Sequence, residues 1–272
     1  MLSIITINYN NNEGLKKTLE SVRHQSFDGY EHIVIDGDSN DGSKQLLEEY
    51  QSEKCIVQSE PDSGIYNAMN KGIRKANGDY VLFLNSGDVF SDENTLGDMH
   101  PYLDGKHALV YGDITFDKGD EQNTFTYPDV LDFEFFMNRS LGHPATFIKR
   151  SLFDEIGLYD ESMKICSDWS FFILAVCKQG VSYKHVNRVI AVFEMLGVSN
   201  DPENQALIET EKQQVLEAHF GHLMREYQQR KAAEERLDSG PHRMIGRIWK
   251  HGFLRKLTVG YFKFVNLFIK KR

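Results

Sequence analysis

The chain has 272 residues, of which 40% are hydrophobic and 26% are charged, as is typical of a soluble globular protein with one sizeable core. The formal net charge of −9 is unevenly distributed: residues 1–238 contain all 40 acids against 22 bases, whereas residues 239–272 contain nine bases and no acid. The acidic main body argues against nucleic acid as the general partner, and the split charge indicates two regions with different surroundings.

Strand and helix patterns alternate along the first 90 residues. Residues 2–8 (LSIITIN) are continuously apolar and β-branched, as in a strand buried on both faces. Helical spacing follows from about Glu13, and this alternation predicts an α/β fold with a parallel sheet whose faces are covered. Ligands of such sheets bind at the carboxyl ends of the strands. The further elements expected here are strands at 30–36, 55–58 and 80–85 and helices around Leu46 and at 65–76.

The rest of the chain is more mixed. The segment DSGP at 238–241 is the clearest break in the sequence. Strand patterns are expected at 108–116, 145–149 and 181–193, and helical patterns at 168–180 and 203–236.

The cysteines and the N-terminus indicate the compartment. Cys55, Cys166 and Cys177 are odd in number and lack CxxC or metal-ligand spacing, which predicts reduced core residues. The sequence runs from Met1 directly into an apolar strand, without a basic leader or a cleavage site. We therefore expect a cytoplasmic protein.

Acidic residues follow two of the expected strands. Asp36 ends the strand IVID, where its carboxylate could accept a hydrogen bond from a nucleobase N–H, although capping the next turn is an equal alternative. Asp88 follows a buried strand in FLNSGDVF, where it could bind a divalent cation together with diphosphate oxygens. The alternative for Asp88 is a turn-forming aspartate beside Gly87.

A third acid, Asp168, comes directly before a strongly apolar helical stretch in KICSDWSFF. It could act as a general base that accepts a proton from an attacking hydroxyl, or it could simply cap the helix. Trp169 beside it offers a flat apolar face to a sugar ring, with a place in the core as the alternative.

Four segments in this order resemble the family 2 glycosyltransferases with the GT-A fold: SIITINYNN, VIDGDSNDGS, SEPDSGIYNAMNKGI and GDYVLFLNSGD. Their order and spacing match those of the family over residues 1–195. Their sequences look most like the branch that serves bacterial exopolysaccharide, capsule and lipopolysaccharide assembly. The resemblance implies a Rossmann-like mixed sheet flanked by helices, with a C-terminal helical extension. The expected regions are a catalytic domain over 1–200 (nucleotide-binding 1–90, acceptor-binding 91–200), a helical extension over 201–238 and a basic tail over 239–272.

The resemblance also implies roles for individual residues. Asp36 would hold the uracil or another base, Asp88 falls at the metal motif, and Asp168 at the position of the catalytic base. His143, in GHPATFIKR, falls near the acceptor and the diphosphate, and a structural histidine is an equal alternative. The other residues expected to border the nucleotide are Thr6, Tyr9, Asp62, Asn70 and Lys71.

The metal motif departs from the family pattern. The family usually has Asp-x-Asp, whereas this chain reads Asn85-Ser86-Gly87-Asp88 and keeps only the last carboxylate. One carboxylate with diphosphate oxygens and water can still hold Mg²⁺ or Mn²⁺. We therefore expect a divalent metal that binds poorly without the nucleotide.

As family 2 enzymes do, the protein is expected to invert the anomeric configuration in one displacement. The expected donor is a nucleotide-diphosphate sugar, with a leaning to UDP, and the transferred group a hexosyl or N-acetylhexosaminyl unit. The expected acceptor is a hydroxyl of a lipid-linked glycan.

The segment 242–272 interleaves Lys and Arg with aromatic and aliphatic residues. Its apolar stretch, 257–269, is shorter than the ~20 residues of a transmembrane helix, so it is expected to lie on the inner face of the cytoplasmic membrane as a basic amphipathic segment. The alternative is a C-terminal helix that packs on the acidic body or on another subunit.

Two other nucleotide-binding classes fit less well. The chain lacks the GxGxxG of a Rossmann dehydrogenase after the first strand, and NYNNNEG lacks the basic, glycine-rich phosphate loop of a nucleotidyltransferase. The alternative function from a different class is a non-catalytic GT-A-fold scaffold with a degenerate metal site. Asn85 and Gly87 in the metal motif are the evidence for it.

Overall fold

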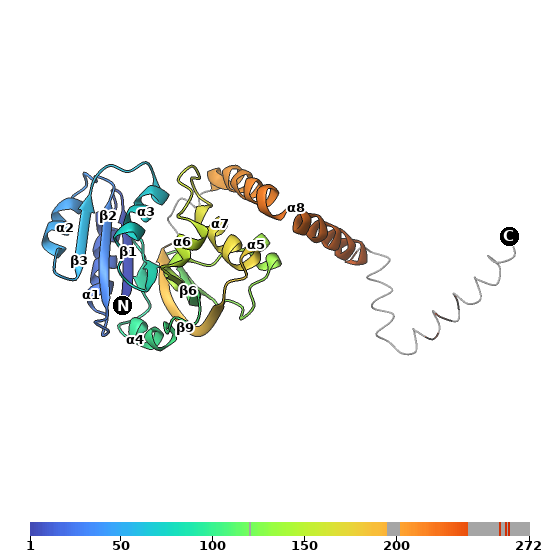
Figure 1. Ribbon diagram of the computed structural model, residues 1–272, viewed down its shortest axis with the longest axis horizontal. Helices are drawn as coiled ribbons and strands as arrows, with labels where there is room; N and C mark the ends of the chain where they lie inside the picture. Colours follow the sequence, from blue (N-terminus) through green and yellow to red (C-terminus); the bar gives the residue numbers. More distant parts are fainter. Residues whose placement is uncertain (120, 195–201, 239–255, 257–258, 260, 262–272) are drawn as a thin grey trace. The chain divides into compact units, whose positions relative to one another are not determined.

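The computed structural model describes residues 1–119, 121–194 and 202–238, together with residues 256, 259 and 261. The chain divides into two units, residues 1–215 and 216–272 (Figure 1). The expected division at residue 200 stays a prediction, and the basic tail over 239–272 lies outside the described residues except for those three positions.

A mixed sheet with helices on its faces forms the first unit. In the described residues its strand order is β3-β2-β1-β4-β8-β6-β9-β5, and β7 pairs with β6. The strands are β1 (Leu2–Asn8), β2 (Tyr30–Asp36), β3 (Cys55–Ser59), β4 (Tyr80–Phe83), β5 (Val89–Phe90), β6 (Leu109–Asp117), β7 (Gln122–Phe125), β8 (Thr146–Lys149) and β9 (Tyr183–Glu194).

The helices connect and flank these strands. The α-helices are α1 (Asn12–Arg23), α2 (Ser43–Tyr50), α3 (Ile65–Lys75), α4 (Thr95–Met99), α5 (Phe133–Asn138), α6 (Leu152–Ile156), α7 (Ser167–Ile173) and α8 (Gln205–Asp238). Shorter turns are 3₁₀ at His100–Tyr102 (η1), His143–Ala145 (η2) and Pro202–Asn204 (η5), and π-helical at Leu174–Lys178 (η3).

The first four strands of the sheet, β3 to β4, are parallel. β1 and β4 are buried almost throughout, whereas the edge strand β3 is partly exposed. On one face, Leu15 and Leu19 of α1 form a cluster with Val34 of β2. On the other face, Gly72 of α3 lies so close to β1 that an added Cβ would be 2.5 Å from a side-chain carbon of Ile5. The alternating strands and helices therefore form the expected parallel sheet with helices on both faces.

The second half of the sheet reverses direction. β8 is antiparallel to β4, β6 is antiparallel to β8, and β9 runs parallel to β6. The end of β9 then pairs antiparallel with the two-residue strand β5, with Val89 opposite Val192. This last pairing brings the end of β9 beside the loop that follows β4.

Most of the expected elements are confirmed, including the strands at 2–8 and 30–36. The helix expected over 168–180 is α7 followed by a π-helical turn, and it stops before Gly180, which has a φ of +64°. The short strands β5 and β7 were not expected. Among the described helices, none is long and apolar enough to cross a membrane.

Candidate active site

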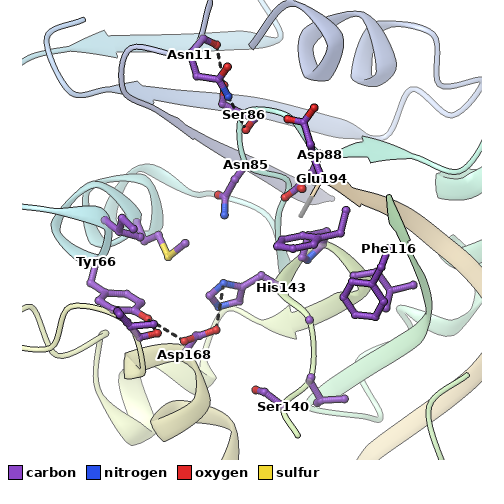
Figure 2. A pocket seen from close by; sticks show the side chains of 18 of the residues that line it. Asn11, Tyr66, Asn85, Ser86, Asp88, Phe116, Ser140, His143, Asp168 and Glu194 are labelled. Atoms are coloured by element: carbon purple, nitrogen blue, oxygen red, sulfur yellow. Dashed lines mark hydrogen bonds and ion pairs between the residues drawn. The ribbon is translucent and has the colours of Figure 1, made fainter. Parts of the chain in front are cut away.

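A cavity of about 420 Å³ lies where the loops after β1 and β4 meet η2 and the start of α7. The sequence analysis singled out three of its lining residues as functional: Asp88, His143 and Asp168. They come from three segments far apart in the chain, and Figure 2 shows their side chains around one space. Tyr66 and Glu194, which are among the other polar lining residues, were not expected.

Asp168 lies in the first turn of α7 but does not cap it. The residue at the cap position is Cys166, and its side chain makes no capping hydrogen bond. Instead, Oδ1 of Asp168 accepts a hydrogen bond of 2.8 Å from the hydroxyl of Tyr66 on α3, and the carboxylate lines the cavity. The capping alternative is therefore not what the structure shows for Asp168.

The Tyr66 hydroxyl stands between two acceptors. Its oxygen is 2.5 Å from the carbonyl oxygen of Ile165 and 2.8 Å from Asp168. Burial, and then the charge of Asp168, raise the pKa of Tyr66 well above its usual value. The phenol thus keeps its single proton, which only one of the two acceptors can receive fully.

His143 lies on the other side of Asp168. Its Nδ1 is 3.9 Å from Oδ2 of Asp168, beyond hydrogen-bond distance, and its Nε2 is 2.9 Å from the hydroxyl of Tyr159. Burial lowers the pKa of His143, and the nearby Asp168 only partly opposes this. A neutral imidazole therefore faces the cavity at neutral pH.

Asp88 is almost completely buried at the cavity wall, with 3% of its surface exposed. Gly87 before it has a φ of +108°, and the Asp88 N–H closes the turn by donating to the carbonyl of Asn85. Burial raises the pKa of Asp88 well above its usual value, although backbone N–H groups of Glu194 and Asn85 oppose this.

Two oxygens of this turn have no partner. Oδ2 of Asp88 and Oδ1 of Asn85 are buried and make no hydrogen bond within the described part of the chain. Orphaned buried acceptors are costly unless a donor or a cation completes them, and oxygen ligands are those that Mg²⁺ and Mn²⁺ prefer. The described residues contain no cluster of three His, Cys, Asp or Glu side chains able to hold a metal alone. The turn thus fits a cation that takes further ligands from a bound phosphate group.

Asp36, at the end of β2, is fully buried and surrounded by donors. Its carboxylate accepts hydrogen bonds from Asn8, from the hydroxyl and backbone N–H of Ser39, and from Ser59. Burial alone would raise the pKa of Asp36, but these donors hold it below its usual value. The carboxylate is therefore ionised and already engaged, and its contact with a base stays a prediction.

A chain of hydrogen bonds links Asp36 to the metal-motif turn. Asn8 donates to Asp36 through its amide nitrogen and accepts a hydrogen bond of 2.8 Å from the Ser86 hydroxyl through its amide oxygen. Asn11 donates in turn to the Ser86 carbonyl. The predicted base-binding and metal-binding ends of the site are thus parts of one network.

Tyr9 and Asp62 lie together beside Asp36. A Cβ added to Gly37 would be 2.6 Å from a carboxylate oxygen of Asp62 and 3.0 Å from a ring carbon of Tyr9. Tyr9 is 67% exposed, so its ring is accessible to a ligand. Contacts of either side chain with a nucleotide stay predictions.

Thr6 and Trp169 lie in the core and do not line the cavity. The hydroxyl of Thr6 donates to the carbonyl of Leu84 beneath the sheet edge. The indole N–H of Trp169 donates to the carbonyl of Phe136, and the side chain is 2% exposed. The structure therefore favours the core alternative for Trp169.

Asn70 and Lys71 on α3 hold neighbouring loops. The Asn70 amide exchanges hydrogen bonds with both backbone groups of Tyr159. Lys71 forms an ion pair of 2.8 Å with Glu60 and donates to the carbonyl of Pro61. Their contacts with a nucleotide stay predictions.

Residues 3–165 match the sequence model of glycosyl transferase family 2. The chain belongs to this family. An uncharacterized glycosyltransferase of Mycobacterium tuberculosis is 34% identical over 213 residues, which cover 76% of this chain and 79% of the relative. A PGL/p-HBAD biosynthesis glycosyltransferase of Mycobacterium bovis is 29% identical over 208 residues, covering 74% of this chain and 79% of the relative.

Solved structures of glycosyltransferases share the fold. TarS of S. aureus, residues 1–349 in complex with UDP, superposes with a TM-score of 0.60 at 21% identity, covering 71% of this chain and 60% of that one. A mannosyltransferase of Pyrobaculum calidifontis in complex with GDP-Man and Mn²⁺ gives 0.54 at 17% identity, covering 71% and 56%. The expected GT-A fold is thus confirmed. The expectation that this protein is a glycosyltransferase enzyme is confirmed as well.

Proposed function

We propose that this glycosyltransferase moves a sugar from a nucleotide-diphosphate donor to an acceptor hydroxyl with inversion, and that Asp168 is the catalytic base. The observation that carries this proposal is the shared cavity: Asp168 lines the same space as Asn85 and Asp88, each of which has a buried side-chain oxygen without a partner among the described residues. A sugar held there would have the base on one side and the diphosphate-binding turn on the other. The acceptor oxygen would form its bond to the anomeric carbon as the bond to the diphosphate breaks.

The contacts of Asp168 leave one carboxylate oxygen open to act as a general base. Its Oδ1 is held by Tyr66, and its Oδ2 is 3.9 Å from the nearest nitrogen of His143, so Oδ2 is available to accept the acceptor's proton. A proton received at Oδ2 would leave Oδ1 able to keep the hydrogen bond that it accepts from Tyr66. Base assistance of this kind typically contributes ~10²–10⁴-fold to the rate.

Asn85 and Asp88 would hold a divalent cation, Mg²⁺ or Mn²⁺. Such a cation, when bound, would supply electrostatic stabilisation of the departing diphosphate. The mannosyltransferase of the same fold was solved with Mn²⁺, which supports this cofactor here.

A UDP-sugar is the proposed donor. TarS structures with UDP and with UDP-GlcNAc show a donor of this kind on the same fold, which supports a hexosyl or N-acetylhexosaminyl transfer. Asp36, with Tyr9 and Asp62 beside it, would form the base-binding end.

The acceptor is proposed to be a lipid-linked glycan, and the tail over 239–272 to bind the membrane surface. The nine bases of this tail and the name of the PGL/p-HBAD biosynthesis relative support this. Each basic residue near an anionic surface is worth about 1 kcal/mol. The full chain should sediment with anionic vesicles at low salt and be released by high salt. Equal binding to neutral vesicles would contradict the electrostatic part of this proposal.

The donor proposal is tested by thermal unfolding of the full chain with UDP-, GDP-, CDP- and dTDP-sugars, each with and without Mn²⁺. We expect a UDP-sugar to raise the melting temperature, and Mn²⁺ to increase this shift. The absence of a shift with every nucleotide, on folded protein, would favour the non-catalytic scaffold, for which the incomplete motif Asn85-Ser86-Gly87-Asp88 is the specific observation.

A further inference from the structure

A second carboxylate lies beside the metal-motif turn. Glu194, the last residue of β9, lines the same cavity as Asp88, and Figure 2 shows the two side chains next to each other. The antiparallel pairing of Val89 with Val192 explains this proximity, because it places the residues before β5 opposite the end of β9. The sequence separates these two acids by about a hundred positions.

Gly87 leaves the space that the Glu194 side chain occupies. A Cβ added at Gly87 would be only 2.7 Å from Oε2 of Glu194. Gly87 also has a φ of +108°, a conformation that residues with a side chain rarely adopt. The glycine therefore allows the backbone conformation of the turn, and its lack of a side chain lets the second carboxylate approach closely.

Among the described residues, the surroundings of Asp88 leave one of its carboxylate oxygens without a donor. Its side chain is buried, with 3% of its surface exposed, and its Oδ2 has no hydrogen-bond donor in the described part of the chain. The Asn85 Oδ1 beside it is also unpartnered. Asp88 and Glu194 line the same cavity, and two neighbouring carboxylates repel each other. A divalent cation between them would offset this repulsion and give the Asp88 Oδ2 a partner.

We propose that Glu194 is the second carboxylate ligand of the divalent cation, together with Asp88. Glu194 would supply a negative charge in place of the aspartates of the family's Asp-x-Asp motif, whose positions are Asn85 and Gly87 in this chain. This inference rests on the proposed function, because the remaining ligands would be diphosphate oxygens and water. Two carboxylates with an amide oxygen form the hard oxygen set that Mg²⁺ and Mn²⁺ prefer.

The competing explanation is that Glu194 only forms an ion pair. Its Oε1 is 3.3 Å from the ammonium group of Lys17, whose side chain is 59% exposed. Removing Lys17 separates the two explanations. If Glu194 binds the cation, loss of the lysine removes a competing positive charge and leaves metal binding equal or tighter. If the ion pair is what matters, loss of either partner has the same effect.

The test is a titration of the full chain with Mn²⁺ in the presence of UDP, followed by the electron paramagnetic resonance signal of free Mn²⁺, with UDP binding measured separately. We expect Glu194→Gln to weaken Mn²⁺ binding at least about tenfold, since a ligand charge is lost. Lys17→Met should bind Mn²⁺ as tightly as the wild type or more tightly. Glu93→Gln, an exposed acid outside the cavity, is the matched control and should bind as the wild type does.

The inference is overturned if Glu194→Gln binds Mn²⁺ as the wild type does, or if Lys17→Met weakens binding as much as Glu194→Gln. It is also overturned, with the donor site intact, if the wild type binds UDP equally well with and without Mn²⁺. A wild type that binds no UDP under any condition contradicts the proposed function itself. If Glu194→Gln unfolds, Glu194→Asp, which keeps the carboxylate on a shorter side chain, should show intermediate Mn²⁺ affinity, and wild-type affinity in it would contradict the role.

Discussion

The pKa values of two buried aspartates of the site are shifted in opposite directions. Asp36 is fully buried, yet hydrogen bonds from Asn8, Ser39 and Ser59 outweigh the effect of burial and lower its pKa. Asp88 is also buried, but it has fewer donors, and its pKa is raised. Burial alone therefore does not decide the charge of a carboxylate. The balance between burial and donors decides it, and at Asp88 burial outweighs the two backbone donors.

The sequence predicts the first three acids of the site but not their contacts. Asp36, Asp88 and Asp168 stand at strand ends or before a helix, where position alone makes them candidates. The sequence pattern does not show that Trp169 lies in the core whereas Tyr66 lines the cavity, since both are aromatic residues on helices. That difference depends on side-chain packing between α3 and α7, which no local sequence pattern encodes.

His32 should make the protein sensitive to acid. Burial lowers the pKa of this histidine to about 3, against 6.5 for an ordinary histidine. The unfolded chain binds a proton below about pH 6.5 and the folded chain does not until about pH 3, so stability is lost as the pH falls through this range. The loss is up to about 1.4 kcal/mol per pH unit.

Urea unfolding at about pH 7 and about pH 4.5 measures this effect. The difference in the free energy of unfolding between the two pH values should be about 2–3 kcal/mol smaller in His32→Gln than in the wild type. Gln keeps a side-chain donor near Thr6, which is 2.9 Å from the His32 Nε2. An equal pH dependence in the two proteins would show that another group titrates.

At the scale of elements, α8 holds the loop that leads to Asp168. Glu211, 5% exposed, accepts hydrogen bonds from the backbone N–H groups of Lys164, Ile165 and Cys166 at 2.6, 3.1 and 2.9 Å. This loop also carries the Ile165 carbonyl that Tyr66 contacts. A residue beyond the family-matched segment thus fixes the backbone next to the proposed base.

Glu211→Ala should therefore destabilise the protein and lower its turnover together. Three backbone N–H groups, of which that of Cys166 is buried, would lose a charged acceptor, and a buried donor left without its acceptor costs about 1–3 kcal/mol. Chemical unfolding and donor turnover measure the two effects. The control is Glu209→Ala, which removes an exposed acid of the same helix. The two variants should differ clearly in stability and in turnover, with the losses confined to Glu211→Ala. Wild-type turnover in folded Glu211→Ala would show that the loop does not need this anchor.

The same scale shows why Glu194 was not predicted. The alternation of strand and helix over residues 1–85 is a local pattern, and the structure confirms it. By contrast, β5 has only two residues, and its partner β9 ends about a hundred residues later. Pairing over such a distance, by so short a strand, leaves no periodicity that a sequence could display.

At the scale of the whole molecule, the order of four motifs predicted the family and the fold better than any single residue did. The family match over residues 3–165 and the shared fold of TarS confirm that prediction. The donor, the acceptor and the membrane contact stay proposals, because they depend on partners and on the tail. The tail's charge of nine bases against an acidic body remains the argument for a surface-bound segment.

The central claim, that Asp168 is the base of a sugar transfer, is tested most directly by Asp168→Asn. Release of UDP from a UDP-sugar should fall by about 10²–10⁴-fold, because the amide cannot accept the proton. The affinity for UDP with Mn²⁺, measured by calorimetry, should stay close to that of the wild type, since the proposed role of Asp168 is to contact the acceptor and not the nucleotide. Wild-type turnover in this variant would contradict the account, whereas lost turnover with intact nucleotide binding would support it.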